Sequence, residues 1–156
     1  MKEIKLTQGK VALVDDGDYE FINHYKWSYN AGYAIRGVYN KLTKKIGRVS
    51  MHRLIIGAKK GQEVDHKDGD KLNNQRSNLR IATRAQNVMN TGLISSNTSG
   101  FKGTYFKKKT NRWFSCIRIG GKLIHLGYFD NKIKAANAYN KAARKYFGEF
   151  AKLNNI

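Results

Sequence analysis

The sequence predicts an α+β protein built from small antiparallel sheets, each followed by a short helical segment. Three observations predict it. Residues 1–56 contain short strand-like runs separated by turns, residues 63–90 follow a strand, loop, strand, helix pattern, and residues 100–156 show three strands followed by one helix. We therefore expect an N-terminal antiparallel sheet joined to a ββα element, and then a three-stranded antiparallel sheet packed on one helix.

The balance of charges indicates a polyanionic partner. Of 156 residues, 30 are Lys or Arg and 11 are Asp or Glu, which gives a formal net charge of +19. Such an excess exceeds what solubility requires and repels itself within a compact fold unless a polyanion is near, so nucleic acid is the expected partner. A ribosome-associated protein, or one that is merely supercharged, is the alternative at this point.

The net positive charge is concentrated in residues 91–156, where acidic side chains are few. Residues 1–50 carry 9 basic and 5 acidic side chains, residues 51–90 carry 8 and 4, and residues 91–156 carry 13 and 2. Residues 91–99 are rich in Ser, Thr, Asn and Gly without sustained periodicity, which is typical of a linker. The predicted domains are 1–90, with a β-rich segment at 1–50 and a ββα core at 51–90, and 100–156, joined by the linker 91–99.

The cysteine count and the apolar runs exclude some classes of protein. Cys116 is the only cysteine, so no internal disulfide and no cysteine-paired structural zinc site is expected. The start of the chain lacks the apolar run of a signal peptide, and no stretch approaches the ~20 apolar residues of a membrane helix. We expect an intracellular, cytoplasmic protein, of a bacterial or phage-infected cell, with no membrane association.

The N-terminal strands are predicted at Val11–Val14, Gly32–Arg36 and Gly47–Met51. Between the first two, the segment Asp15–Asp18 has the composition of a turn. A calcium loop is disfavoured there because its further spaced ligands and its terminal glutamate are missing. The segment therefore predicts a small antiparallel sheet with an acidic turn.

The segment that carries chemistry starts where a strand ends in Asp65 and His66, and residues 79–81 form the return strand. Between them, Asp68 and Asp70 flank a glycine and are expected to set a turn. Hydrolysis of a phosphodiester needs a base for the attacking water and positive charge for the phosphorane and the leaving oxygen. A histidine beside an aspartate, with an amide or imidazole ligand on a facing helix, supplies both the base and, through a bound cation, the positive charge.

A short helix is predicted to follow the return strand. Thr83 and Gln86, three residues later, form a capping box that starts it. Asn87 then lies one turn into the helix, where a helix laid across the strand pair brings it opposite Asp65. Taken singly, such residues are more often surface turns, caps or solvated polar groups, but their joint spacing indicates a site.

The pattern Asp-His-x-Asp-Gly, followed by Asn-Asn, Asn-Leu and a helix-borne Asn, resembles the HNH (His-Me finger) endonucleases over residues 51–90. It is similar in particular to the phage and intron-encoded homing enzymes in which Asn replaces the last His. The resemblance implies a ββα-metal core that cuts DNA and leaves a 5′ phosphate and a 3′ hydroxyl.

Carried over by position, the resemblance makes His66 the general base and Asp65 and Asn87 the ligands of one Mg²⁺ or Mn²⁺ ion per active site. Asn78 matches the middle asparagine, which braces the loop that orients the histidine. His52 either touches the scissile phosphate or the backbone nearby, or is a packed or DNA-facing histidine. Arg53, next to it in a His-Arg pair, is expected to contact DNA.

The C-terminal strands are predicted at Phe101–Phe106, Arg112–Ile119 and Lys122–Phe129, with Asp130 as the N-cap of a helix that runs to Gly148. Alternation along the middle strand turns one face toward the alanine-rich helix and leaves the other face open. The open face gathers the expected DNA-binding residues, which are Lys102, Tyr105, Lys107, Arg112, Arg118 and His125. A solvated sheet surface is the alternative.

This stretch resembles the APETALA/ethylene-response-factor (ERF) DNA-binding domain. The resemblance is carried by Gly103, Trp113, Ile117, residues 126–129, Ala135, Ala136, Ala138, Tyr139 and Asn154. These are mostly core or turn positions, whereas the positions that would face a groove depart from the plant pattern. The resemblance therefore implies the fold and DNA binding, without the target sequence.

Together these features predict a site-directed DNA endonuclease of the homing type, in which the C-terminal module finds the site and the ββα element cuts. Double-stranded DNA is the expected partner, and the protein is expected to act as a monomer, with a dimer left open. One alternative is a non-catalytic DNA-binding transcriptional regulator that retains the nuclease scaffold. Another is an RNA-binding accessory factor, which the absence of a recognisable single-strand RNA motif disfavours.

Overall fold

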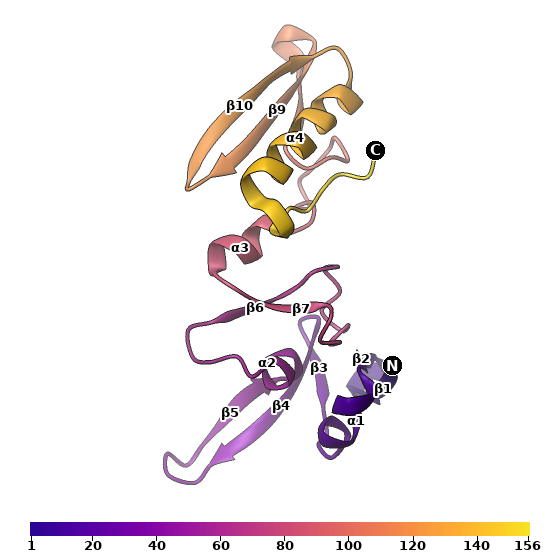
Figure 1. Cartoon of the computed structure of the whole chain (residues 1–156), viewed down its shortest axis with the longest axis vertical. Coiled ribbons are helices and arrows are strands. Elements are labelled where there is room, and N and C mark those ends of the chain that lie inside the picture. Colours follow the sequence, from indigo (N-terminus) through magenta and orange to yellow (C-terminus); the bar gives the residue numbers. More distant parts are fainter. The chain divides into compact units, whose positions relative to one another are not determined.

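The computed structural model describes all residues, 1–156, and confirms a mixture of helices with several small antiparallel sheets. The chain forms two compact units, Met1–Asn87 and Val88–Ile156, and each has its own apolar core. None of the helices is both long enough and apolar enough to span a bilayer. Figure 1 labels the helices and strands, except β8, by their order along the chain.

The first unit opens with an antiparallel pair, β1 (Lys2–Lys5) and β2 (Val11–Val14), followed by the helix α1 (Asp16–Asn23). The predicted turn at Asp15–Asp18 is wrong, because these residues start α1. Asp15 is the N-cap and two further aspartates lie in the first turn, where a helix favours negative charge. The helix buries Ile22 in the core of the unit.

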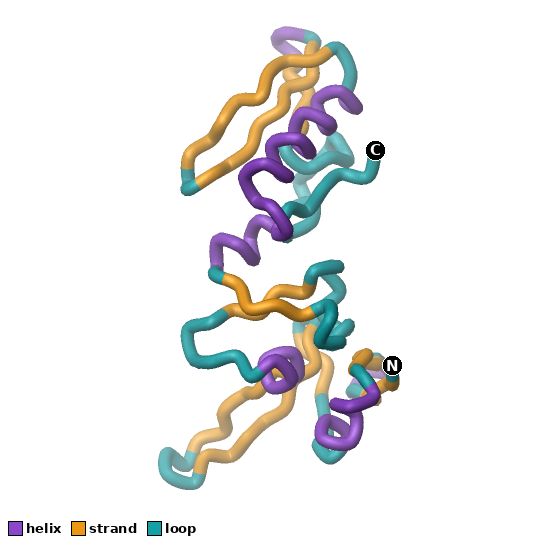
Figure 2. The backbone as a smooth tube through the Cα atoms, viewed as in Figure 1, coloured by secondary structure: helices purple, strands orange, loops and turns teal.

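A second sheet has the strand order β3 (Ser28–Asn30), β4 (Tyr33–Asn40), β5 (Lys45–Ser50) and is antiparallel throughout. The strands β4 and β5 form a long hairpin whose tip projects away from the other elements of the unit (Figure 2). The last predicted strand ends one residue early, because Met51 begins the helix α2 (Met51–Ile56). This helix was not predicted from the sequence.

The expected strand, strand, helix element is present. The strands β6 (Glu63–His66) and β7 (Leu79–Ala82) pair antiparallel, and α3 (Arg84–Met89) follows. The predicted capping box is confirmed: Thr83 N donates to Gln86 Oε1 at 2.8 Å, and Gln86 N donates to Thr83 Oγ1 at 3.2 Å. This cap fixes where α3 begins and therefore where Asn87 lies.

The core of the first unit joins all three groups of strands. Its buried side chains come from the first sheet, α1, β4, α2 and the β6–β7 pair, and include Ile4, Val14, Ile22, Ala34, Met51, Ile55, Val64 and Leu79. The first sheet also contacts the β6–β7 loop, since Leu13 N donates to Leu72 O and Asn74 N to Leu13 O, both at 2.8 Å. The N-terminal strands thus support the loop that follows His66.

In the second unit, β8 (Thr104–Lys107), β9 (Arg112–Ile119) and β10 (Lys122–Phe129) form an antiparallel sheet with β9 in the centre. The helix α4 (Lys132–Phe147) contacts all three strands and buries Tyr139 and Ala143 against Ile117. Its N-cap is Asn131, whose side chain accepts from Lys134 N at 2.9 Å, and not the predicted Asp130.

Residues 91–99, expected as a linker, lie within the second unit. Their end is ordered by local hydrogen bonds: Asn97 Oδ1 accepts from Gly100 N at 2.8 Å, and Ser99 Oγ donates to Phe101 O at 2.9 Å. Ser99 is buried. This end of the segment is a structured turn leading into β8.

Candidate active site

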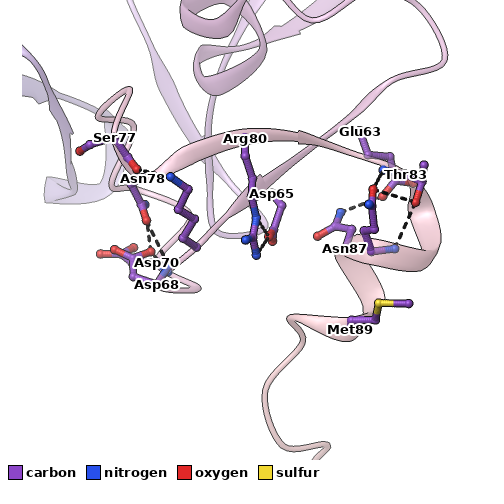
Figure 3. Close-up of polar contacts among 12 residues, drawn as sticks. Glu63, Asp65, Asp68, Asp70, Ser77, Asn78, Arg80, Thr83, Asn87 and Met89 are labelled. Atoms are coloured by element: carbon purple, nitrogen blue, oxygen red, sulfur yellow. Dashed lines mark hydrogen bonds and ion pairs between the residues drawn. The ribbon is translucent and has the colours of Figure 1, made fainter. Parts of the chain in front are cut away.

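The strand β6 presents Asp65 to a cation on the partner strand. Asp65 lies directly opposite Arg80 of β7, and residues facing each other across an antiparallel pair share a face of the sheet. Arg80 donates from Nε and Nη2 to Asp65 Oδ2 at 2.8 and 2.6 Å (Figure 3). Asp65 is only 4% exposed, so its charge is balanced inside the protein by the guanidinium.

Asn87 reaches the same face of β6 from the helix. Its Nδ2 donates to Glu63 Oε2 at 2.7 Å (Figure 3), and Glu63 is two residues before Asp65, hence on the same side of the strand. The pKa of Glu63 is lowered from its usual value. The hydrogen bond from Asn87 is the main cause, and Arg84 contributes a smaller effect in the same direction. Since Nδ2 is directed at Glu63, the amide oxygen of Asn87 is the atom left to act as a ligand.

His66 lies in a cluster of rings on the other face of the strand. Its ring centroid is 5.1 Å from that of His52 and 6.2 Å from that of Tyr33, and the Tyr33 and His52 centroids are 5.2 Å apart. The cluster joins the start of β4, the start of α2 and the end of β6. Burial lowers the pKa of His66, and burial together with the charge of His66 lowers that of His52 to about 4.

Asn74 determines which nitrogen of His66 carries the proton. Its Nδ2 donates to Leu72 O at 3.0 Å, which directs Oδ1 toward His66 Nε2 at 3.4 Å. An amide oxygen only accepts, so the hydrogen of a neutral imidazole belongs on Nε2 and the basic lone pair on Nδ1. Asn74 is fully buried and holds the imidazole in one orientation. Burial lowers the pKa of His66, and the hydrogen bond with Asn74 opposes that shift only in part.

Asn78 ties together the loop between β6 and β7. Its Nδ2 donates to Asp68 Oδ1 at 2.9 Å and to Asn73 O at 2.8 Å, and its Oδ1 accepts from Asp68 N at 3.0 Å. Burial raises the pKa of Asp68, but hydrogen bonds from Asn73, Asp70 N and Asn78 outweigh it and leave the pKa lowered. As expected for a turn, Asp68 and Asp70 accept from backbone N–H groups two residues ahead.

The predicted residues thus fall into two groups that meet at the end of β6. Asp65 and Asn87 belong to one face, and His66 and His52 to the other. His52 is 8% exposed and its Nδ1 has no hydrogen-bond partner, which favours the packed alternative for this residue. Asn78 contacts the β6–β7 loop, so any effect that it has on the site is transmitted by that loop.

The donor set fits a hard divalent cation held by few protein atoms. No group of three or more His, Cys, Asp or Glu side chains is arranged to hold a metal. One carboxylate, Asp65, and one amide oxygen, Asn87, match the way Mg²⁺ is bound through one or two protein oxygens, with water and phosphate completing the shell. Such an ion would share the carboxylate with Arg80.

Five of the residues expected to bind DNA share one face of the C-terminal sheet. The pairing register places Tyr105, Lys107, Arg112, Arg118 and His125 on the face opposite to α4. Arg112 and Arg118 are exposed, whereas Phe114, between them, is buried beneath the rings of His125 and Tyr128 at 5.0 and 5.3 Å. The face is therefore an aromatic patch between exposed cations.

Two other cations expected to contact DNA are engaged with the protein's own backbone. The Arg53 guanidinium donates to the carbonyls of Gln62 and Lys59 and holds the loop between α2 and β6. The Lys102 ammonium donates to Met89 O at 2.7 Å and to Thr91 O at 2.6 Å. Burial, with a smaller effect from Lys152, lowers the pKa of Lys102 to about 8.

Sequence reasoning missed four side chains of the site: Glu63, Arg80, Asn74 and Tyr33. Glu63 and Arg80 could have been found from the sequence. Glu63 lies two residues before Asp65, hence on the same face of the strand, and Arg80 lies opposite Asp65 when the two predicted strands are paired. Asn74 and Tyr33 could not, since their contacts depend on how the loop and a distant strand pack.

The sequence is similar to those of known proteins. A sequence model of the family described as HNH endonuclease matches residues 50–89. The chain is 33% identical over 156 residues to an uncharacterized HNH endonuclease of Acanthamoeba polyphaga mimivirus, covering 96% of this chain and 77% of that protein. It is also 34% identical over 93 residues to Protein 3.8 of Escherichia phage T7, covering 60% of this chain and 76% of that protein.

A shorter similarity extends to plant proteins. An AP2-like ethylene-responsive transcription factor of Arabidopsis thaliana is 42% identical over 61 residues, which is 39% of this chain and 13% of that protein. The chain therefore resembles one small region of the plant protein.

Proposed function

Because the chain belongs to the HNH endonuclease family, we propose that it is a site-directed DNA endonuclease of the homing type that hydrolyses phosphodiester bonds at the end of β6. One observation carries this proposal. Asp65 and His66 are adjacent at the end of β6, with Asn87 held on the Asp65 side and the imidazole held on the other. The proposed site of the scissile phosphate is this strand end, where the two groups come from neighbouring residues of one strand.

In the proposed reaction His66 is the general base. Nδ1 accepts a proton from a water molecule as the water oxygen attacks phosphorus, while Nε2 keeps its hydrogen toward Asn74. The bond from phosphorus to the 3′ oxygen breaks, so the products carry a 5′ phosphate and, once that oxygen is protonated, a 3′ hydroxyl. The lowered pKa of His66 supports this role, since a base must be unprotonated at working pH.

Asp65 and Asn87 are proposed to hold one divalent cation, Mg²⁺ or Mn²⁺, through a carboxylate and an amide oxygen. When bound, the ion supplies positive charge to the phosphate and to the leaving 3′ oxygen. Arg80 holds the buried carboxylate of Asp65 in place through their ion pair. His52 packs on the ring of His66 and is proposed to position it.

The second unit is proposed to bind the DNA duplex through the open face of its sheet, in the manner of the ERF domain that residues 100–154 resemble. The exposed cations Arg112 and Arg118 and the aromatic patch support this, as does the similarity to a plant transcription factor. A sheet of this kind can enter a major groove, where base edges are distinguishable.

Incubation of the full chain with supercoiled plasmid tests the proposal. With Mg²⁺ or Mn²⁺ we expect nicked or linear DNA, and with EDTA intact plasmid. Religation of the products by a ligase without prior kinase treatment would show 5′ phosphates and 3′ hydroxyls. Intact plasmid under every metal condition, with binding retained, would favour the non-catalytic regulator.

A further inference from the structure

The β4–β5 hairpin is a strongly cationic element with no assigned partner. Its loop and second strand carry Lys41, Lys44, Lys45 and Arg48, and no Asp or Glu occurs between Glu20 and Glu63. All four cations are exposed. Such a one-sided charge repels itself within the hairpin and is offset when a polyanion binds.

The same hairpin also exposes large apolar side chains. Leu42 at the tip is 95% exposed, and Tyr39 and Ile46, which lie directly opposite each other across the two strands, are 58% and 74% exposed. Arg48 shares their face of the hairpin, because strand residues two apart point to the same side. Exposed apolar side chains beside charged ones are typical of a binding surface, and the charged side chains of this hairpin are all positive.

The tip is held in one shape by its own hydrogen bonds. Asn40 Oδ1 accepts from Leu42 N and from Thr43 N, both at 3.0 Å, which closes the loop and presents Leu42 outward. Six residue pairs join the two strands below it. The hairpin is therefore a formed ribbon rather than a segment that must fold on its partner.

The root of the hairpin belongs to the active site. The first residue of β4 is Tyr33, and β5 ends at Ser50, so that His52 follows two residues later. These two rings pack on each other and on His66. A ligand bound by the hairpin would therefore lie at a fixed distance from His66, the proposed general base.

We propose that the β4–β5 hairpin is a DNA-binding arm that lies in the major groove beside the cleaved bond. Two-stranded ribbons fit the width of that groove, lysines reach the flanking phosphates, and apolar side chains contact thymine methyl groups. This inference rests on the proposed nuclease function. The six residues of β5 span about 20 Å, so the arm reaches about six base pairs from the cut.

The electrostatic component is tested on the full chain in EDTA, where binding occurs without cleavage. In the triple variant Lys41→Gln, Lys44→Gln, Lys45→Gln, the slope of log affinity against log salt for a mixed-sequence duplex should fall by about 2 to 3, because each phosphate contact contributes about 0.9. The control triple Lys5→Gln, Lys10→Gln, Lys26→Gln removes the same charge from exposed positions of the same unit. It should change the slope far less, and equal slopes for the two triples would overturn the proposal.

The groove is tested by dimethyl sulfate footprinting on a duplex that contains a mapped plasmid cleavage position. The wild type should protect guanine N7, in the major groove, within about six base pairs of the cut. The Leu42→Asn and triple-lysine variants should lose that protection. Protection of adenine N3, in the minor groove, or of guanines that do not depend on the hairpin, would contradict the assignment.

The outcomes separate this inference from the proposed function. Hairpin-dependent binding without metal-dependent cleavage would refute the chemistry and leave the arm in place. Metal-dependent cleavage with binding that is insensitive to the hairpin variants would refute the arm and leave the chemistry in place. Circular dichroism and thermal melts of each variant exclude unfolding as the cause.

Discussion

Asn87, proposed as a metal ligand, is itself held by Glu63 at 2.7 Å, and this pair can be tested by a single change. Glu63→Ala removes the acceptor that directs the amide. Partners of this kind typically contribute 10–100-fold to metal affinity, so the Mg²⁺ concentration for half-maximal cleavage should rise by about 10-fold or more.

The matched control is Arg84→Ala, which removes the other, more exposed partner of Glu63. It should leave the Mg²⁺ requirement almost unchanged, because exposed ion pairs contribute little. An unaltered requirement in Glu63→Ala would show that Asn87 does not depend on this contact.

Asn78 is expected to act through the loop. Asn78→Ala removes three hydrogen bonds and leaves Asp68 N and Asn73 O without their partner, which should cost about 1–3 kcal/mol of unfolding free energy. Urea unfolding measures this loss. The neighbouring Ser77→Ala, at an exposed position, should be neutral, and similar stabilities for the two variants would argue against a bracing role.

At the residue scale, the sequence singles out candidate groups of the site but not their hydrogen-bond partners. His66, Asp65 and Asn87 stand out because their spacing follows local strand and helix geometry. The engagement of Arg53 and Lys102 with carbonyl groups was not predictable, since those carbonyls belong to loops whose course depends on tertiary packing. From their charge alone both residues were expected to contact DNA. In the structure both side chains donate hydrogen bonds to backbone carbonyls of the protein itself.

At the element scale, the contact between the start of β8 and α4 depends on a single glycine. Gly103 has φ +69°, and a Cβ there would lie 2.1 Å from Tyr139 Cδ2 and 2.6 Å from Cys116 O. Gly103→Ala combines backbone strain with a steric clash and should destabilise the second unit by more than about 3 kcal/mol. Chemical unfolding followed by the near-UV signal measures the effect.

Gly120→Ala is the control, because Gly120 also has a positive φ, +54°, but open space around its Cβ position. It should cost about 1 kcal/mol from backbone strain alone. Equal losses for the two variants would show that the close approach to Tyr139 is not what requires a glycine at position 103.

The strands with clear alternation and local turn residues were predicted closely. For β9 and β10 the observed bounds equal the expected ones, because the Gly120-Gly121 turn and the alternation fix them locally. The helices α1 and α2 were missed because they are short, of 8 and 6 residues, and α1 starts with an Asp-Gly pair that is typical of turns. Their stability comes from core residues such as Ile22 and Met51, which only the folded unit brings together.

At the scale of the whole molecule, the second unit is proposed to bind the duplex in addition to the hairpin of the first unit, and residues 91–156 carry 13 basic and 2 acidic side chains. Deletion of residues 99–156 should therefore weaken duplex binding and reduce its salt slope by about 0.9 for each phosphate that the deleted residues neutralise. Salt titrations of binding compare the truncated and full chains. An unchanged slope would remove the second unit from the DNA interface.

The central claim is that one imidazole at the end of β6 performs the chemistry, and His66→Ala tests it most directly. Cleavage of supercoiled plasmid in Mg²⁺ and duplex affinity in EDTA are measured on the same preparations of wild type and variant. The account predicts that cleavage is lost while affinity is unchanged. Cleavage at the wild-type rate, or an equal loss of cleavage and affinity, would contradict it.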